Sequence, residues 1–348
     1  MSTDLSHAAP TLEQVAALAG VSRSTVSRVV NKSPHVTDEA AAAVKQAIET
    51  LGYVPNRAAR SLASRKTHVV ALVVPESTAK VFADPFFASV VQGVALQLAD
   101  TEYTLNMVIA SEASPEKTRR YLTGGNVDGA LVVSHHTGDH SYARIGQTLP
   151  VVFGGRPLSD EESDSFFVDV DNVAGAETAT QHLIDTGCRH LAIVAGRQDM
   201  PAGVDRLAGW RAAVRRAGID DSLVESGDFS PRHGADAMRR LLDRGQPIDG
   251  VFCSNDQMAA GAMSVLRERG LRVPEDVSLV GFDGDYFSET SNPPLTTISQ
   301  PATGLGRKMA EVMVDLIEGR EVDRVTVMPT HLLVRGSTRP LAGSQPAL

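Results

Sequence analysis

Hydrophobic side chains in the first 54 residues recur at the spacing of helices. Three stretches each have one apolar face, over residues 12–19, 23–30 and 38–51. Thr11 and Gln14 are spaced as a capping box that starts the first helix, and Gly52 is suited to end the third in the left-handed conformation. Two helices joined by a tight turn at Gly20 and followed by a third predict an all-α helix-turn-helix head over residues 1–54.

The hydrophobic period changes beyond residue 67. Runs such as VVALVV lack polar alternation, as strands buried on both faces do, and they alternate with helical stretches. This order predicts parallel, doubly wound α/β sheets, and its length exceeds one usual domain, so we expect two similar lobes. The predicted divisions are a hinge helix or linker, a first lobe, a second lobe, a crossover that returns to the first lobe, and a tail, over residues 55–67, 68–165, 166–295, 296–340 and 341–348.

Charge separates these parts of the chain. The 348 residues carry a formal charge of −9, but residues 1–67 hold eight basic and five acidic side chains, which gives +3 and leaves −12 for the rest. A basic head on an acidic body indicates a nucleic-acid partner for the head alone. Cys188 and Cys253 lie far apart, the first residues lack an apolar signal segment, and no apolar run is long enough to span a membrane. We therefore expect a cytoplasmic protein.

The stretch VSRSTVSRVVN carries the chemistry of DNA recognition. Arg23, Ser24, Ser27 and Arg28 fall near one face of the second helix, opposite its valines. Arginine commonly donates two hydrogen bonds to guanine in the major groove, and hydroxyl side chains suit phosphate oxygens. The alternative is an ordinary solvated face of a small helical bundle.

The segments TLEQVAALAGVSRSTVSRVVN and HVTDEAAAAVKQAIETLGYVPNRAARSLASRKT resemble the head of the LacI/GalR family of bacterial transcriptional regulators. The resemblance implies that Arg23, Ser24 and Arg28 read bases. It implies contacts with the DNA backbone from Thr11, Ser22, Thr25, Ser27, Asn31, His35, Tyr53 and Asn56. It also implies a hinge helix that folds on DNA, in which Leu62 enters the minor groove beside Ala59.

Segments such as DRLAGW, SNDQMAAGAM and NPPLTTISQP resemble the effector-binding core of the same family, which is similar to periplasmic sugar-binding proteins. Ligands of parallel sheets bind at the carboxyl ends of strands. The effector residues that this implies are Phe87, Gly155, Arg206, Phe229, Asn255 and Asp283. Other roles stay open: Asp283 could cap a loop, Asn255 could only start its helix, and the single tryptophan, Trp210, is expected in the lobe core.

Gly155 departs from many sugar-responsive members of the family, which carry Asp there. We interpret the loss of a carboxylate as room for a bulkier ligand, such as a disaccharide. The stretches FGGRPL and AGRQDMPAGVDRLAGW are most similar to those of actinobacterial repressors that respond to cellobiose and β-glucosides. The histidines of SHHTGDH lack the ligand spacing of a metal site, and no nucleophile motif is evident, so we expect no metal, cofactor or catalysis.

The sequence therefore predicts a homodimeric repressor that binds a palindromic operator in the bacterial nucleoid and is released by a small carbohydrate, with no membrane partner. Two alternatives remain. In one, a purine or a phosphoprotein acts as co-repressor and strengthens DNA binding. In the other, the chain is a small-molecule binding protein or an enzyme on the same scaffold.

Overall fold

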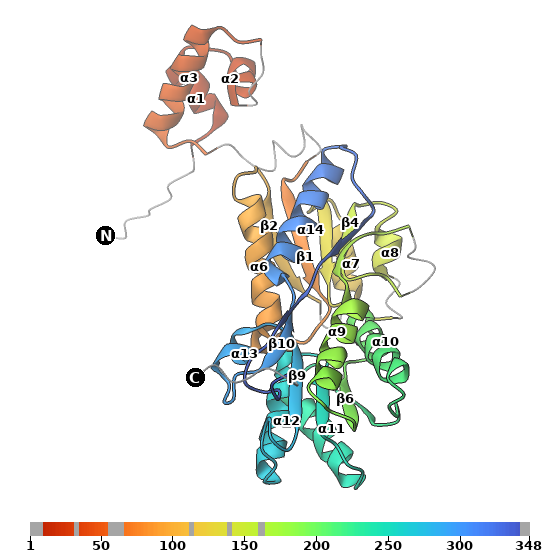
Figure 1. Ribbon diagram of the computed structural model, residues 1–348. Coiled ribbons are helices and arrows are strands. Elements are labelled where there is room, and N and C mark those ends of the chain that lie inside the picture. The colour runs from red at the N-terminus through yellow and green to blue at the C-terminus, as the bar shows by residue number, and fades with distance from the viewer. Residues whose placement is uncertain are drawn as a thin grey trace, which may run out of the picture. The chain divides into compact units, whose positions relative to one another are not determined.

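The computed structural model describes residues 10–30, 35–54, 66–110, 115–137, 141–158 and 164–341. The chain divides into two compact units, a head within residues 1–68 and a core over residues 69–348 (Figure 1). None of the helices in the described ranges has the length and apolar character needed to cross a membrane.

The head is all helical, as predicted. It contains α1 (Leu12–Ala19), α2 (Arg23–Val30) and α3 (Asp38–Leu51). Thr11 and Gln14 form the expected capping box at the start of α1, and Gly20 and Gly52 end α1 and α3 in the left-handed conformation, with φ of 65° and 60°. The local sequence thus fixes both ends of these two helices.

A small apolar core holds the three helices together. Val15, Val26 and Val44 come one from each helix, and all three are fully buried. Tyr53, just after α3, is buried with them. The polar face of α2 therefore remains available to solvent, because its apolar face is used for packing.

The first half of the core, the N-lobe, is built on a six-stranded parallel sheet in the order β11-β5-β4-β3-β1-β2. Its strands are β1 (Val69–Val74), β2 (Thr104–Ile109), β3 (Gly129–Val133), β4 (Val151–Gly154), β5 (Phe166–Val170) and β11 (Val325–Met328). Its helices are α5 (Thr78–Ala83), α6 (Pro85–Leu98), α7 (Pro115–Thr123), α8 (Ser141–Ile145) and α14 (Ala302–Ile317). Separate apolar clusters cover the two faces, one from α6 and α14 and the other from α7 and α8.

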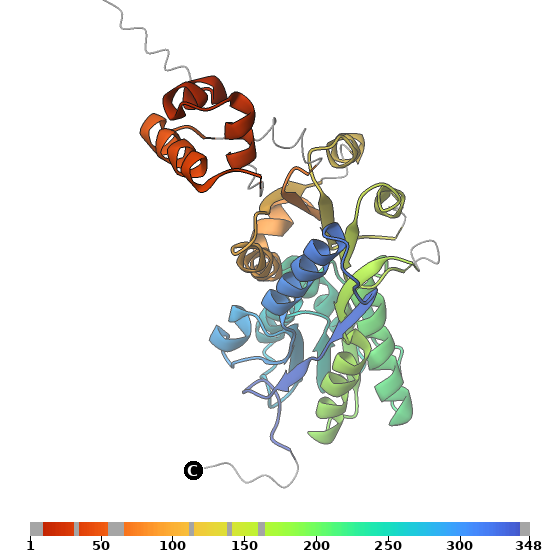
Figure 2. The ribbon, with the colours of Figure 1, turned by 90° about the horizontal axis from the view of Figure 1, so that it is seen from above.

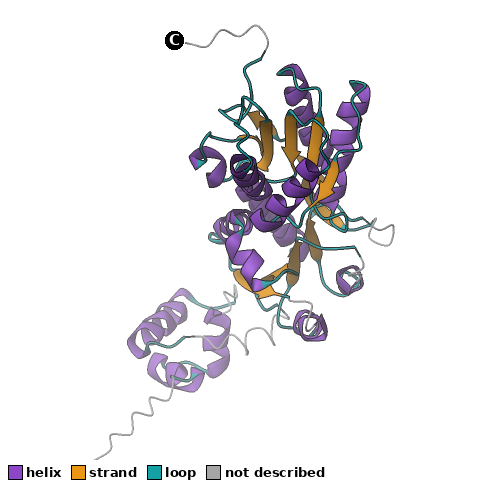
Figure 3. Cartoon of the chain, turned by 90° about the horizontal axis from the view of Figure 1, so that it is seen from below, coloured by secondary structure: helices purple, strands orange, loops and turns teal. Residues whose placement is uncertain are grey.

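The second half, the C-lobe, repeats this plan with the order β12-β10-β9-β8-β6-β7. Its strands are β6 (Leu191–Ala195), β7 (Val224–Ser226), β8 (Gly250–Cys253), β9 (Ser278–Asp283), β10 (Thr296–Ser299) and β12 (His331–Leu333). Its helices are α9 (Asn172–Asp185), α10 (Pro201–Arg216), α11 (Pro231–Asp243), α12 (Asp256–Glu268) and α13 (Tyr286–Thr290). In both lobes the strands lie inside and the helices outside (Figure 3).

The structure corrects the predicted boundary between the lobes. We placed it at residue 165, but β5 follows that residue and pairs with β4 in the N-lobe sheet, so the first crossing comes at Asp171. The segment 296–340 does not simply return to the N-lobe either. Its α14 and β11 do so, whereas β10 and β12 belong to the C-lobe sheet, where β12 is antiparallel to β10. The dark blue end of the described chain accordingly runs from one lobe to the other (Figures 1 and 2).

Close helix packing anchors the returning α14 on the N-lobe. A Cβ atom on Gly306 would lie 2.2 Å from the carbonyl oxygen of Val90 in α6, and one on Gly93 would lie 2.0 Å from that of Thr303. Only glycine permits two backbones to approach this closely. The two glycines therefore explain how α14, far along the chain, becomes part of the N-lobe core.

Candidate functional site

The polar surface predicted on α2 is present on the head. Arg23, Ser24 and Arg28 are exposed, whereas Val26 on the opposite face is fully buried. The Oγ atom of Ser22 accepts the backbone N–H of Thr25 at 3.2 Å, so Ser22 caps α2. The three predicted base-reading side chains thus project from a helix whose start is fixed by a hydrogen bond.

An acidic neighbour holds Arg23 in the free head. Its Nη1 atom lies 3.1 Å from Oε1 of Glu13, with 73% and 59% of the two side chains exposed. The backbone contacts of Glu13 and the charge of Arg23 lower the pKa of this carboxyl. Exposed ion pairs of this kind contribute little to stability, so the arginine can exchange its partner for DNA at little cost.

The residues expected to touch the DNA backbone differ in their exposure. Thr11, Ser22 and His35 are exposed, Thr25 and Ser27 are half-buried, and the ring of Tyr53 is buried in the head core. Tyr53 therefore has a packing role whether or not its hydroxyl meets a phosphate. Two more predicted backbone contacts, Asn31 and Asn56, lie outside the described residues. The two predicted minor-groove residues, Ala59 and Leu62, lie outside them as well.

A cavity lies between the two lobes at the carboxyl ends of their strands, and it encloses about 720 Å³ when the open solvent at its mouth is included. The lining includes all six predicted effector residues, Phe87, Gly155, Arg206, Phe229, Asn255 and Asp283. It also includes polar residues that the sequence reasoning missed, Lys80, Asp84, Asp169, Asn172 and Gln300.

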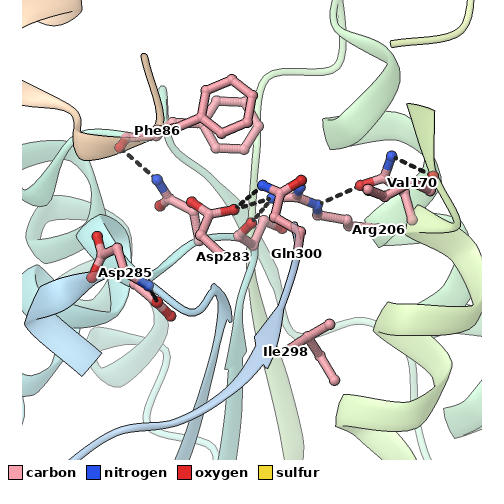
Figure 4. Close-up of polar contacts among 12 residues, drawn as sticks. Phe86, Val170, Arg206, Asp283, Asp285, Ile298 and Gln300 are labelled. Atoms are coloured by element: carbon pink, nitrogen blue, oxygen red, sulfur yellow. Dashed lines mark hydrogen bonds and ion pairs between the residues drawn. The ribbon is translucent and has the colours of Figure 1, made fainter. Parts of the chain in front are cut away.

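Arg206 organises the polar floor of this cavity. Its Nε atom donates to Oδ1 of Asn172 at 2.9 Å, and its Nη1 atom donates to the carbonyl oxygen of Ser254 at 2.6 Å and approaches Oδ1 of Asp283 at 3.4 Å. The guanidinium carbon also lies 3.6 Å from the centre of the Phe282 ring. Figure 4 shows Arg206 between Asp283 and Gln300 on one side and the chain near Val170 on the other. A buried cation held by this many partners has one orientation.

Asp283 is the acidic partner of Arg206, and both residues belong to the C-lobe. It accepts a hydrogen bond of 2.6 Å from Nε2 of Gln300, and its φ of 116° is an uncommon conformation for a residue with a side chain. Burial raises its pKa well above the usual range, against the lowering effect of Arg206. Ser134 and Phe229, which also line the cavity, have positive φ as well. Backbone strain of this kind is concentrated at binding sites.

Two further carboxylates enter the cavity from the N-lobe. Asp84 caps α6 by accepting the N–H of Phe86 at 3.0 Å, and Asp169, on β5, accepts the N–H of Arg156 at 2.8 Å. Burial raises the pKa of both groups. Desolvated carboxylates form strong hydrogen bonds with hydroxyl donors.

Asn255 has both of the roles that the sequence left open. Its Oδ1 atom accepts the N–H of Met258 at 2.9 Å and so caps α12, while its Nδ2 atom donates to the carbonyl oxygen of Phe229 at 3.0 Å. Each end of the amide keeps capacity for one more hydrogen bond inside the cavity. Capping and pocket lining are therefore compatible at this position.

Aromatic rings supply the apolar walls. Phe87 packs edge-on to Phe86 with ring centres 5.6 Å apart, and both line the cavity. Phe229 lies on the opposite lobe, and Nζ of Lys80 is 5.9 Å from its ring centre. Trp210 is fully buried in the C-lobe core, as expected, and is not part of the cavity lining.

A Cβ atom at Gly155 would make ordinary contacts, but the backbone there has an unusual conformation. A Cβ atom there would lie 3.5 Å from Cε1 of His135 and 4.0 Å from Cγ of Pro201, which is ordinary contact. Its φ of 109°, however, strains any residue with a side chain. A carboxylate at this position would therefore carry backbone strain, as Asp283 does at its φ of 116°.

Two histidines of the SHHTGDH loop contact side chains of the N-lobe. His135 lines the cavity and stacks edge-on against Phe153, and Nε2 of His136 lies 3.3 Å from Oε1 of Glu76. No group of three or more His, Cys, Asp or Glu side chains in the described part of the chain could hold a metal ion, and His140 lies outside that part.

Comparisons with known proteins agree with this arrangement. Residues 11–56 match the model of bacterial regulatory proteins of the lacI family, and residues 180–338 match a periplasmic binding protein-like domain. The HTH-type transcriptional regulator CelR of Thermobifida fusca is 47% identical over 333 residues, which is 94% of this chain and 98% of that protein. The chain belongs to the lacI family of bacterial regulatory proteins.

Two solved structures of this family extend the comparison. A CelR–cellobiose complex is 46% identical, with a TM-score of 0.74 over 94% of this chain and 99% of its own. A lac repressor dimer bound to operator and an anti-inducer is 27% identical, with a TM-score of 0.85 over 96% of this chain and 100% of its own. The predicted helix-turn-helix head and two-lobed core are thereby confirmed, and the chain is a DNA-binding transcriptional regulator. The relatives are named as regulators and repressors, not as enzymes.

Proposed function

We propose that this protein is a homodimeric repressor that leaves a palindromic operator when cellobiose or another β-glucoside enters the interlobe cavity. The observation that carries the proposal is the cavity itself, which combines buried carboxylates and amides with phenylalanine rings. A sugar presents hydroxyl groups at its edges and C–H surface on its faces, and both kinds of wall are available. The CelR–cellobiose complex supports the same ligand class.

The charge of the cavity favours a neutral ligand. Lys80 and Arg206 stand against Asp84, Asp169 and Asp283, and the guanidinium of Arg206 is already engaged by protein groups. A phosphorylated ligand needs surplus positive charge, which these two cations and three carboxyl groups do not supply. This balance argues against a phosphorylated effector and, with the CelR comparison, favours a sugar over a purine co-repressor.

Each cavity residue then has a role in the proposal. Arg206, Asn255 and Asp283 bond ring hydroxyls, and Phe87 and Phe229 lie against the faces of the sugar rings. Gly155 lines the cavity without a carboxylate, and we place the second ring of a disaccharide on this side of the cavity.

The head performs the DNA half of this function. Arg23, Ser24 and Arg28 read bases in each half-site, and Leu62 with Ala59 enters the minor groove at the operator centre. The backbone is held by Thr11, Ser22, Thr25, Ser27, Asn31, His35, Tyr53 and Asn56. We place the protein in the cytoplasm, at the nucleoid, where such operators lie.

Release requires that the sugar bind the DNA-incompetent form more tightly. A difference of about 1–3 kcal/mol is the usual scale of such coupling.

Titration calorimetry with cellobiose, glucose, hypoxanthine and glucose 6-phosphate tests the ligand class. We expect heat from cellobiose, weaker binding of glucose, and none from the other two. Binding of hypoxanthine in place of cellobiose would instead establish the co-repressor alternative.

A further inference from the structure

One short segment of the C-lobe faces both the cavity and the N-lobe. This segment, residues 197–206, follows β6 and includes the first turns of α10. Met200, Pro201, Ala202 and Arg206 line the cavity. Asp199 and Asp205 lie between or beside them but are not part of the lining, and their carboxylates contact N-lobe side chains instead. The segment therefore connects effector contacts directly to contacts between the lobes.

The stronger of these contacts joins Asp205 to Arg156. Nε of Arg156 donates to Oδ2 of Asp205 at 2.7 Å, and Nη2 donates to Oδ1 at 2.5 Å, so the pair is bidentate. Only 12% of the Asp205 side chain and 37% of the Arg156 side chain are exposed. Paired, partly desolvated groups with this geometry interact more strongly than exposed ion pairs.

Arg156 is itself fixed to the N-lobe. Its backbone N–H donates to Asp169 on β5, and the preceding N–H of Gly155 donates to the carbonyl oxygen of Val168 in the same strand. The guanidinium therefore reaches across to Asp205 from a backbone that is fixed at a strand end, and the ion pair joins the two lobes.

A second contact holds the other end of the segment. The backbone N–H of Thr137, in the N-lobe, donates to the carbonyl oxygen of Asp199 at 2.8 Å. The Asp199 carboxylate lies 3.2 Å from Nδ1 of His136 and is oriented by Arg197, whose Nε donates to it at 2.8 Å. The segment is thus docked on the N-lobe at both of its ends.

We propose that Arg156 and Asp205 are positioning residues that set effector affinity without touching the effector, by holding the 197–206 segment against the N-lobe in the closed form of the core. Because Arg206 and the cavity-lining residues lie on the same segment, opening this pair displaces them from the ligand. The inference rests on the proposed function only for the identity of the ligand, since the docking contacts are present irrespective of what binds.

The test compares Arg156→Met, Asp205→Asn and the double variant with the wild-type full chain. Arg156→Met keeps the apolar stem and the backbone N–H, and Asp205→Asn keeps the shape of the side chain. The matched control is Asp221→Asn. It removes an ion pair with Arg215, which lies on α10 as Asp205 does, but this pair is formed entirely within the C-lobe. Two readouts are needed: cellobiose affinity by calorimetry, and exchange of the Thr137 amide hydrogen by mass spectrometry.

We expect each single variant to bind cellobiose roughly tenfold more weakly, as coupled pairs in contact do. The double variant should be no weaker than the singles, because both changes break one interaction. Exchange at Thr137 should accelerate in these variants even without ligand, and the Asp221→Asn control should change neither readout.

Wild-type exchange at Thr137 in the Arg156 and Asp205 variants would overturn the proposal, even if affinity fell, because the two residues would then act at the ligand and not through docking. Additive losses in the double variant would overturn it as well. Failure of the wild-type protein to bind cellobiose would count against the proposed function alone, since Thr137 exchange still decides the role of the pair.

Discussion

The head and the core place their functional side chains in opposite ways. In the head, Arg23, Ser24 and Arg28 are exposed on one helix, and eight consecutive residues define the surface. In the core, Arg206, Asn255 and Asp283 are almost entirely buried and come from one helix and two strand ends of the same lobe. Recognition by the head therefore depends on local sequence, whereas recognition by the core depends on topology. Substitutions in the head should change binding alone, and substitutions in the cavity should change binding and stability together.

The largest effect is expected at Arg206. Its replacement by Gln leaves Asp283 buried without its cationic partner, which typically costs about 3–5 kcal/mol of stability. Thermal unfolding should show a large drop in Tm, and calorimetry should show no measurable sugar binding. The control is Arg215→Gln on the same helix, whose ion pair with Asp221 is exposed on the arginine side and should matter by less than about 0.5 kcal/mol. Equal losses in the two variants would contradict the role of Arg206.

The core should also respond to acid through Glu76. Burial raises the pKa of Glu76, but contacts with His136, Lys80 and Ser134 lower it to about 2 from 4.5. Because the folded-state pKa is depressed, this stabilisation is complete above pH 4.5 and is lost as the pH falls toward 2. It amounts to on the order of 3 kcal/mol.

The free energy of unfolding, measured between about pH 5 and pH 3, should therefore fall less steeply in Glu76→Gln than in the wild type. Glu116→Gln, which removes an exposed ion pair with Arg119, is the control and should change the slope much less than Glu76→Gln does. No Asp or Glu of the head's described residues is buried, so this acid response distinguishes the core from the head. Parallel pH profiles for wild type and Glu76→Gln would refute it.

At Arg23 the effect should be confined to DNA. Replacing Arg23 with Ala removes a proposed base contact and should weaken operator binding by about 1–3 kcal/mol, while Tm and sugar affinity stay unchanged. Fluorescence anisotropy on an operator selected from random duplexes measures the first quantity. Lys45→Ala, on α3, changes the charge equally, and we expect it to have a smaller effect on specific binding. A loss shared equally by specific and random duplexes would mean that Arg23 contacts only phosphates.

The smallest predicted change is a gain in operator affinity. Glu13 competes with DNA for Arg23 through their 3.1 Å ion pair, so Glu13→Gln should raise operator affinity slightly. Glu39→Gln gives the same change of charge in the first turn of α3 and serves as the control. In the same binding assay, operator affinity should rise more in Glu13→Gln than in Glu39→Gln; an equal rise in both would contradict competition between Glu13 and DNA.

The same contrast explains how much the sequence could predict. The caps of α1 and α3 and the apolar face of α2 were readable because helix signals are local. The residues at the ends of the strands recognised in the sequence, such as Asn255 and Asp283, were placed correctly in the cavity. Their roles toward a ligand remain a prediction.

Two of the cavity residues missed from the sequence, Asp169 and Gln300, follow from missed strands and crossings. Asp169 lies on β5 and Gln300 directly follows β10, and neither short strand has the long apolar run that identified β1. Their sheet membership depends on three crossings between lobes, at Asp171, after β10 and after β11, which no local pattern encodes. The Arg156–Asp205 pair was invisible for the same reason, because its partners lie 49 residues apart on different lobes.

The central claim is that a sugar in the core releases the head from DNA. Its most direct test is the operator affinity of the wild-type full chain, measured by anisotropy with and without saturating cellobiose. We predict that cellobiose weakens binding by roughly tenfold or more, in keeping with about 1–3 kcal/mol of coupling. Unchanged or tighter operator binding in the presence of bound cellobiose would contradict the account.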